Sequence, residues 1–392
     1  MLNTIFSAIQ RTFRRELKRM VSRPIYLLAS VGVMTFCFIF FLTFFNEGQP
    51  EKMPIAVVDL DNSSFSRQYL RNLQTTQHID IDEHLSSFKE AREEMQRGKI
   101  YAFVYIEPDF YKNVITNRRP NLTFYVNNAY LVAGSLAAKD LSYMSLMTAG
   151  GVQRQVLRAK GVADSQIMGI VQPISVDMHS IGNPWINYGT YLLNVLLPVM
   201  LHLMTLMLTV FSIGVELKER TSVEWMKNAD NSMFAALMGK LTPYTIIFVV
   251  LGLIGNLLLY KYMHFPLNSS IGWMFLATIL LVLAGQALGI LFIGLLPVLR
   301  DGITVAGIFG TLSITAAGAT FPVEQLPYFF RELTMAFPMR HYFLIYVNQA
   351  LNGVDVSLSL TKYLILLGFM LLPLFVYKRL KNAAIKMNYP IK

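Results

Sequence analysis

Six stretches of the chain are apolar, and segments rich in charged residues separate them. A helix of about 20 apolar residues crosses a hydrocarbon core of about 30 Å, and in lipid it satisfies its own backbone hydrogen bonds. We therefore predict an α-helical polytopic membrane protein with six transmembrane helices. They cover Pro24–Phe45, Tyr188–Ile213, Leu241–Tyr260, Ile271–Val298, Ile303–Thr320 and Tyr363–Tyr377.

Lysine and arginine gather beside the first and the last of these stretches. Since basic flanks of short loops are retained in the cytoplasm, both termini are expected inside, which agrees with an even number of crossings. The segment 46–187 then lies outside, and the basic tail 378–392 lies inside. The flanking basic residues include Arg11, Arg14, Arg15, Lys18, Arg19, Arg23, Lys378, Arg379, Lys381 and Lys386.

Composition supports this class, because 54% of the residues are hydrophobic and 15% are charged. The formal net charge of +10 comes from the membrane flanks, so the lipid bilayer is the expected partner and a nucleic acid is not. Cys37 is the only cysteine, which excludes a disulfide framework within one chain. No metal site is predicted.

The segment 1–23 has apolar residues at helical spacing. Phe6, Ile9, Phe13, Leu17 and Met20 recur every three or four residues, and the basic residues fall largely elsewhere around the helix. This pattern predicts an amphipathic helix in the inner interface, an elbow that leads into the first span. The alternative is a basic flank that only sets the topology.

The segment 46–187 has a periodicity of its own. PIAVVDLD, HIDID, YAFVYI and LTFYVN alternate or run apolar as strands do, and SSFKEAREEMQRG between them is helical. We predict an inserted extracytoplasmic α/β domain, followed by a long helix at 129–161 as a stalk.

Two aspartates follow the first of these strands. Asp59 and Asp61 have the spacing of a metal-binding pair in transferases and phosphatases. The stretch Asp61-Asn62-Ser63-Ser64 is also typical of a helix N-cap, whose side-chain oxygens accept from free backbone N–H groups. The cap is the interpretation that we favour.

Polar residues lie along one face of the second span and of the fifth. Because buried polar groups are costly in lipid, these faces should contact protein or water. Helix packing is one interpretation, and a translocation pathway or dimer seam is the other. The residues concerned are Asn194, His202, Thr205, Thr209, Thr304, Thr311 and Thr315.

Between the fifth and sixth spans, prolines interrupt two apolar pieces that are too short to cross the membrane. We predict short re-entrant helices at 321–345 in the outer leaflet, with Glu324 and Arg340 at the outer rim. An ordinary external loop is the alternative. The interrupting prolines are Pro322, Pro327 and Pro338.

A charged island, ELKERTSVEWMKNAD, separates the second and third spans. It predicts a short cytoplasmic helix at 215–230 that another protein could bind. Together with MGKLTPY, and with GATFPVEQLP and FPMRHY before the last span, this island resembles the permease subunit of type-2 ABC exporters. PIAVVDLDNSSFSRQYLRNL resembles the subgroup with a large extracytoplasmic domain between the first two spans. One departure is Thr221, where the family often has glycine after arginine.

The resemblance implies two permease halves in the bacterial inner membrane that ATPase subunits drive. The island becomes the coupling helix, the short outer helices become the exit gate, and the external domain can meet a periplasmic adaptor. The residues implied at the coupling helix are Glu216, Glu219, Arg220 and Glu224.

The chain has no GxxxxGK[ST] phosphate loop. We therefore expect no enzyme activity and no cofactor in this chain, with ATP and Mg²⁺ on a separate ATPase subunit. The cargo could be a drug, a lipid or a glycan-like molecule. A surface receptor or scaffold is the alternative function, and a membrane-embedded transferase would require a polar catalytic cluster near the interface.

Overall fold

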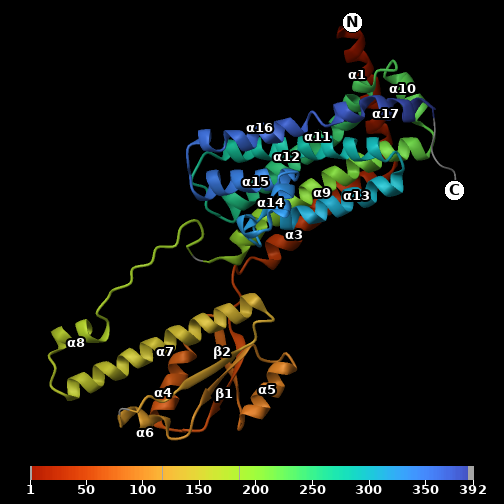
Figure 1. The fold of residues 1–392 in the computed structure, drawn as a ribbon. Coiled ribbons are helices and arrows are strands. Elements are labelled where there is room, and N and C mark those ends of the chain that lie inside the picture. The colour runs from red at the N-terminus through yellow and green to blue at the C-terminus, as the bar shows by residue number, and fades with distance from the viewer. Residues whose placement is uncertain (1, 117, 185, 387–392) are drawn as a thin grey trace. The chain divides into compact units, whose positions relative to one another are not determined.

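The computed structural model describes residues 2–116, 118–184 and 186–386 (Figure 1). The chain divides into two compact units. The helical unit comprises Met1–Gly48 and Ser180–Lys392, and the α/β unit comprises Gln49–His179.

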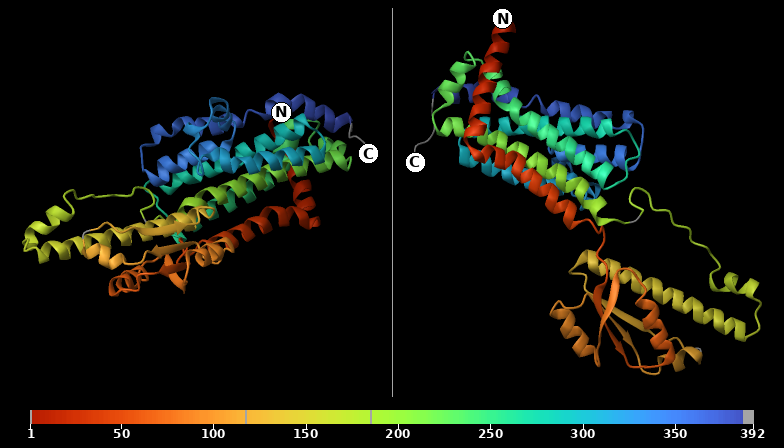
Figure 2. Two further views of the ribbon diagram at one scale, coloured as in Figure 1. Left: turned by 60° about the horizontal axis from the view of Figure 1, so that its bottom comes forward. Right: turned by 180° about the vertical axis from the view of Figure 1, so that it is seen from behind.

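The helical unit begins with α1, which is followed by helices of the length that a membrane requires (Figures 1 and 2). Side chains of Asn187, Ser232 and Ser270 accept backbone hydrogen bonds at the starts of α9, α11 and α12, as N-cap residues do. The helices are α1 (Leu2–Ser22), α2 (Pro24–Leu27), α3 (Val33–Phe44), α9 (Tyr188–Lys218), α10 (Ser222–Asn228), α11 (Met233–Leu257), α12 (Ile271–Leu295), α13 (Leu299–Ala317), α14 (Tyr328–Thr334), α15 (Pro338–Tyr346), α16 (Leu360–Phe369) and α17 (Pro373–Lys386).

Five helices in the described residues are long and apolar enough to cross a membrane. They correspond to five of the six predicted spans. Their bounds are Pro24–Phe44, Tyr188–Lys218, Met233–Tyr262, Ile271–Leu295 and Leu360–Lys386. π-Helical turns join α2 to α3 and extend α11, and Leu371 and Leu372 break the last span before Pro373.

The remaining predicted span, the fifth in chain order (Ile303–Thr320), corresponds to α13, which has 19 residues. It runs beside α9 (Figure 2). It is less apolar than the other five, because Arg300 and Asp301 lie in its first turn. A sixth crossing therefore stays a prediction.

In the α/β unit the four predicted strand segments form one mixed sheet of order β2-β1-β3-β4. β1 (Met53–Asp59) pairs in parallel with β2 (Ile79–His84) and β3 (Ala102–Ile106), and β3 pairs antiparallel with β4 (Leu122–Val126). Strand β1 is buried on both faces, as expected for the centre of a parallel sheet.

Helices cover both faces of this sheet (Figure 1). Ile55 and Val57 point into one core with α4 (Ser64–Leu73) and α7 (Leu131–Ala159). Ala56 and Val58 point into the other core with α5 (Phe88–Gln96). Two short helices complete the unit, α6 (Phe110–Ile115) and α8 (Asp164–Val171).

Two predicted segments differ in detail from the structure. The expected single helix at 215–230 is the last turn of α9, a turn at Glu219–Thr221, and α10. The turn forms because Arg220 has a left-handed backbone, with φ of 59°. The predicted outer helices at 321–345 are a 3₁₀ turn at Val323–Gln325 and the helices α14 and α15.

Candidate functional site

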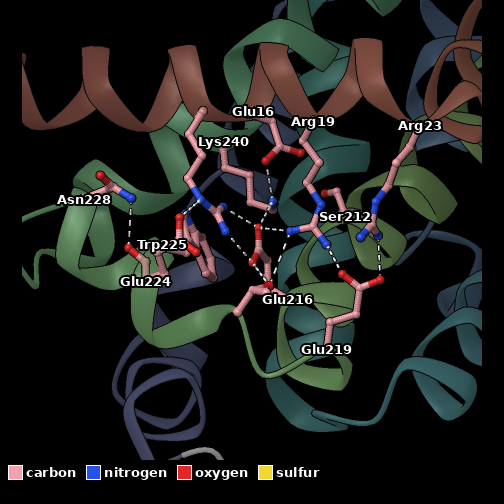
Figure 3. A network of polar contacts seen from close by, with 12 residues as sticks. Glu16, Arg19, Arg23, Ser212, Glu216, Glu219, Glu224, Trp225, Asn228 and Lys240 are labelled. Carbon is pink, nitrogen blue, oxygen red and sulfur yellow. Dashed lines mark hydrogen bonds and ion pairs between the residues drawn. The ribbon is translucent and has the colours of Figure 1, made fainter.

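Charged side chains from α1, α9, α10 and α11 meet at one end of the helical unit (Figure 3). At the centre is Lys240 of α11, whose side chain is fully buried. Its Nζ lies 2.5 Å from Glu16 Oε2 and 2.9 Å from Glu216 Oε1. Lys240 thus joins α1 to the end of α9.

Glu216 is the carboxylate on which most of these contacts converge, and its side chain is also fully buried. Arg15 donates to its two oxygens at 2.6 and 3.1 Å. Arg19 Nη1 lies 2.6 Å from Oε1, and the Thr221 hydroxyl donates to Oε2. Three cations and a hydroxyl therefore surround one carboxylate.

Further ion pairs extend the cluster towards solvent. Glu219 pairs with Arg19 at 2.7 Å and with Arg23 at 2.5 Å. Arg15 Nε lies 3.2 Å from Glu224 Oε1. We call the set of these side chains the charge network. It contains Glu16, Glu216, Glu219, Glu224, Arg15, Arg19, Arg23 and Lys240.

The network is balanced, since it contains as many cations as carboxylates. Burial of a charge costs several kcal/mol unless it is paired and hydrogen-bonded. Glu16 also meets this condition, because the Tyr244 hydroxyl donates to its Oε1 at 2.6 Å. The pairing therefore allows α1 to pack closely against α11 and joins it to the end of α9 through long side chains.

The arginines of α1 stay charged in this setting. Burial by itself would lower the pKa of Arg15, but hydrogen bonds and the charges of Glu216 and Glu224 raise it above its ordinary value. The pKa of Arg23 is raised, first by its hydrogen bond to Glu219. The contacts between α1 and the end of α9 are therefore charge-assisted, the stronger class of hydrogen bond.

Helix α10 has an inner and an outer face. On the inner face, the Trp225 indole N–H donates to Ala236 O at 3.1 Å, and Lys240 Nζ lies 5.4 Å from the centre of the indole ring. Ser222 donates to Ala384 O of α17 at 2.8 Å. On the outer face, Glu224 and Lys227 are exposed. The helix thus connects an exposed surface to α11 and α17.

The predicted coupling residues fall into two groups. Glu219, Arg220 and Glu224 are exposed at the turn and on α10, whereas Glu216 is buried inside the network. Glu216 is therefore out of reach of a partner protein and acts within the chain. Sequence reasoning missed Glu16 and Lys240, although a single acid in a basic flank and a single lysine before an apolar run each require a partner.

The polar face predicted on the second span points into the helical unit. His202, Thr205 and Thr209 are buried, and both threonine hydroxyls donate to backbone carbonyls of their own helix. This face packs on two glycines of α12. A Cβ on Gly285 would lie 3.0 Å from His202 Nδ1, and one on Gly289 would lie 2.8 Å from Thr209.

The predicted side chains His202, Thr205 and Thr209 are enclosed within one copy, and their role in a pathway or dimer seam stays a prediction. Asn194 is also buried, and its amide donates to Thr190 O at 2.8 Å. The arrangement on α9 is that of helix packing through small residues.

The predicted residues of α13 have the opposite environment. Thr304, Thr311 and Thr315 are exposed. A Cβ on Gly307, on the same face, would have no heavy atom within 4 Å. This face is open in the single chain, in contrast to the face of α9.

At the predicted outer helices, Arg340 is buried rather than at an exposed rim. It donates to Ala317 O at 3.0 Å and to Glu324 at 3.1 Å, so it caps the end of α13. Gly318 makes room for it, since a Cβ there would lie 2.4 Å from Arg340 Nη1. Pro322, Pro327 and Pro338 each stand at the start of one of the short helices.

In the α/β unit the predicted N-cap is made by Ser63, whose hydroxyl accepts from the Ser66 N–H at the start of α4, and the paired aspartates hold the turns beside it. Asp59 accepts from the backbone N–H groups of Asp61 and Asn62 and from the Ser66 hydroxyl. Asp61 accepts from the backbone N–H of Tyr111. Across the described residues, no group of three or more histidine, cysteine, aspartate or glutamate side chains could hold a metal ion.

These features define a class. The chain is a multi-pass membrane protein whose α/β unit lies in the sequence between the first span and the second, and whose helices carry a charge network at one end. The family model described as ABC-2 family transporter protein matches residues 24–377. The chain belongs to this family, whose members are the membrane components, or permeases, of ABC transporters and are not themselves catalytic. Such permeases normally work with an ABC ATPase subunit. No curated protein matches the chain.

Proposed function

We propose that this chain is the permease subunit of an ATP-driven exporter that moves a drug-like, lipid-like or glycan-like cargo out across the bacterial inner membrane. The observation that carries the proposal is α10, a short helix with an exposed charged face that is anchored through Trp225 and the charge network. Both termini are cytoplasmic in this proposal, α13 is the fifth of six spans, and the α/β unit is extracytoplasmic, where an adaptor could bind.

In this mechanism the ATPase subunit binds the outer face of α10 and the turn before it. ATP and Mg²⁺ are held by that subunit. Its closure displaces α10, and the displacement reaches α11 through Trp225 and Lys240 and reaches α1 through Glu219 and Glu224. A ligand shifts a conformational equilibrium only through contacts that differ between the two states. Because the side chains of the network are paired, a displacement of α10 is transmitted to α1, α9 and α11.

A second permease copy or a paralogue would meet this chain at the exposed face of α13. Support comes from the threonines and Gly307 on that face, because small residues let two helix backbones approach closely. The helices α14 and α15 would then form the outer gate, with Arg340 joining them to the end of α13.

The test is purification of the tagged chain from its native membrane under gentle conditions, with an assay of ATP hydrolysis in the same fraction. We expect an ABC ATPase subunit to co-purify with vanadate-sensitive activity. A preparation with no ATPase, under conditions that preserve a known membrane complex, would contradict the proposal and favour a surface receptor or scaffold.

Substitutions on α10 and on the turn before it separate coupling from assembly. Glu224→Ala and Glu219→Ala should reduce cargo-stimulated ATP hydrolysis while the chain still inserts into the membrane. Glu93→Ala, at a half-buried glutamate on α5 of the α/β unit, is the control. Unchanged stimulation in both the Glu224 and the Glu219 variant would refute the coupling role.

A further inference from the structure

The α/β unit contains a cleft of about 750 Å³ on the face of the sheet covered by α4 and α7. It lies in the range of about 300–1,000 Å³ that ligand sites occupy. No part of the proposed transport mechanism uses this cleft. Its lining includes Phe65, Ser66, Tyr69, Ile106, Phe110, Arg118, Arg119, Leu122, Ser145, Ala149, Val152 and Val156.

The length of α7 creates this cleft. A helix of 29 residues is about 43 Å long, whereas a strand of seven residues covers only about 23 Å. The buried residues of α7 all lie between Gly134 and Leu141. Its second half therefore extends past the sheet (Figure 1). It contacts α8, and no residue of α7 beyond Leu141 is buried.

The walls of the cleft are largely apolar. Phe65 and Phe110 stack with their ring centres 6.0 Å apart, and Val152 and Val156 face them from α7. The polar atoms at the base are already paired. The Tyr69 hydroxyl contacts Ser145 Oγ at 3.1 Å, and Ser66 donates to Asp59 at 2.6 Å. The interior is thus suited to an apolar body.

The mouth of the cleft carries positive charge. Arg118 and Arg119 are exposed. Among the described residues, they are the only charged side chains that line the cleft. Ile106 ends β3 and Ser66 is held by Asp59 at the end of β1. The cleft therefore opens near the carboxyl edge of the parallel strands, where open α/β sheets bind ligands.

We propose that this cleft binds a single-chain amphipathic anion, with its apolar chain between α4 and α7 and its acidic group at Arg118 and Arg119. The apolar walls select the chain, and the arginine pair selects the charge, since guanidinium groups bind carboxylate or phosphate in a bidentate manner. The volume of about 750 Å³ is sufficient for one alkyl chain. This inference does not depend on the transport function.

The test uses the full chain in nanodiscs of zwitterionic phosphatidylcholine and a diazirine-bearing palmitic acid as the probe. The diazirine-bearing hexadecanol serves as its neutral counterpart. After illumination, mass spectrometry identifies the labelled peptides. We expect the acid to label peptides of α4 and α7 that line the cleft, about tenfold more than the alcohol does.

Two sets of variants test the geometry. Ala149→Trp fills the cleft and should reduce labelling by the acid at least fivefold. The double variant Arg118→Glu and Arg119→Glu, at two exposed positions, should reduce labelling by the acid about tenfold and leave labelling by the alcohol unchanged. Arg154→Glu is a single charge reversal at an exposed position outside the lining and should have no effect.

Three outcomes would overturn the proposal. The first is equal labelling by acid and alcohol in the unmodified chain. The second is labelling that the double charge reversal reduces no more than Arg154→Glu does. The third is preferential labelling by a photoreactive phosphatidylglycerol of the bilayer, or protection of the cleft by a co-purified protein, which would assign it to a lipid or a protein partner instead.

Discussion

Replacement of Lys240 with methionine is the sharpest test of the charge network. Methionine keeps the length and apolar stem of the side chain but removes the ammonium group that pairs with Glu16 and Glu216. Glu216 retains Arg15 and Arg19. Glu16 keeps a hydrogen bond from the neutral hydroxyl of Tyr244 and the more distant charge of Arg19. The variant therefore leaves one buried carboxylate without a directly paired cation.

Removal of one partner from a buried ion pair costs about 3–5 kcal/mol. One kcal/mol corresponds to roughly 2–4 °C in the midpoint of thermal unfolding for a domain of about 200 residues. We therefore expect Lys240→Met to lower the midpoint by about 10 °C. Adding Glu16→Gln removes the unpaired charge, so the double variant should regain more than half of this loss.

The chain supplies its own reporter for this measurement. Cys37 is the only cysteine and is buried in α3, so a thiol-reactive fluorogenic dye reports the unfolding of the helical unit. Lys218→Met, at an exposed lysine in the last turn of α9, is the matched control and should shift the midpoint by less than about 1 °C. Equal midpoints for Lys240→Met and this control would refute the reasoning, as would a double variant whose loss is the sum of the two single losses.

The same assay tests the packing of α9 on α12. Gly289→Ala should lower the midpoint, because its Cβ would lie 2.8 Å from Thr209 and overpacking costs about 1–3 kcal/mol. Gly307→Ala should be neutral in a single chain, since it meets open space, and a loss there equal to that of Gly289→Ala would contradict the assignment of the two faces. In the α/β unit, Asp59→Ala removes three hydrogen bonds, and we expect faster amide hydrogen exchange in α4. Because this residue holds the turn before α4, the variant should leave ATP hydrolysis unchanged, and loss of a divalent-cation dependence would contradict this structural role.

Hydrophobic patterning predicted the membrane helices better than it predicted their ends. The third span was expected to begin at Leu241, because Lys240 interrupts the apolar run. The helix instead begins at Met233, since the charge of this lysine is neutralised by two carboxylates from other helices. The second span likewise continues past the expected end at Ile213 to Lys218, with Glu216 buried in its last turn.

The faces of the helices could not be assigned from the sequence. Threonines at helical spacing on α9 and on α13 gave the same pattern, yet those on α9 are buried and those on α13 are exposed. The difference comes from the partner helix. Gly285 and Gly289 of α12 provide close packing for α9, and which helices are neighbours is a long-range property that local spacing does not contain.

The network explains how a helix as short as α10 can transmit a force. A seven-residue helix is not stable in isolation, because nucleation outweighs the few hydrogen bonds that it forms. Its stability comes from the hydrogen bonds that Trp225 donates to α11 and Ser222 donates to α17. Glu224, and Glu219 in the turn before it, are paired with arginines of α1. A partner cannot shift α10 without breaking these contacts or moving the three helices with it, and breaking them would strand buried groups. Concerted movement of α1, α10, α11 and α17 is therefore the path of lower free energy, which supports the proposal that an ATPase acts on the exposed face of α10.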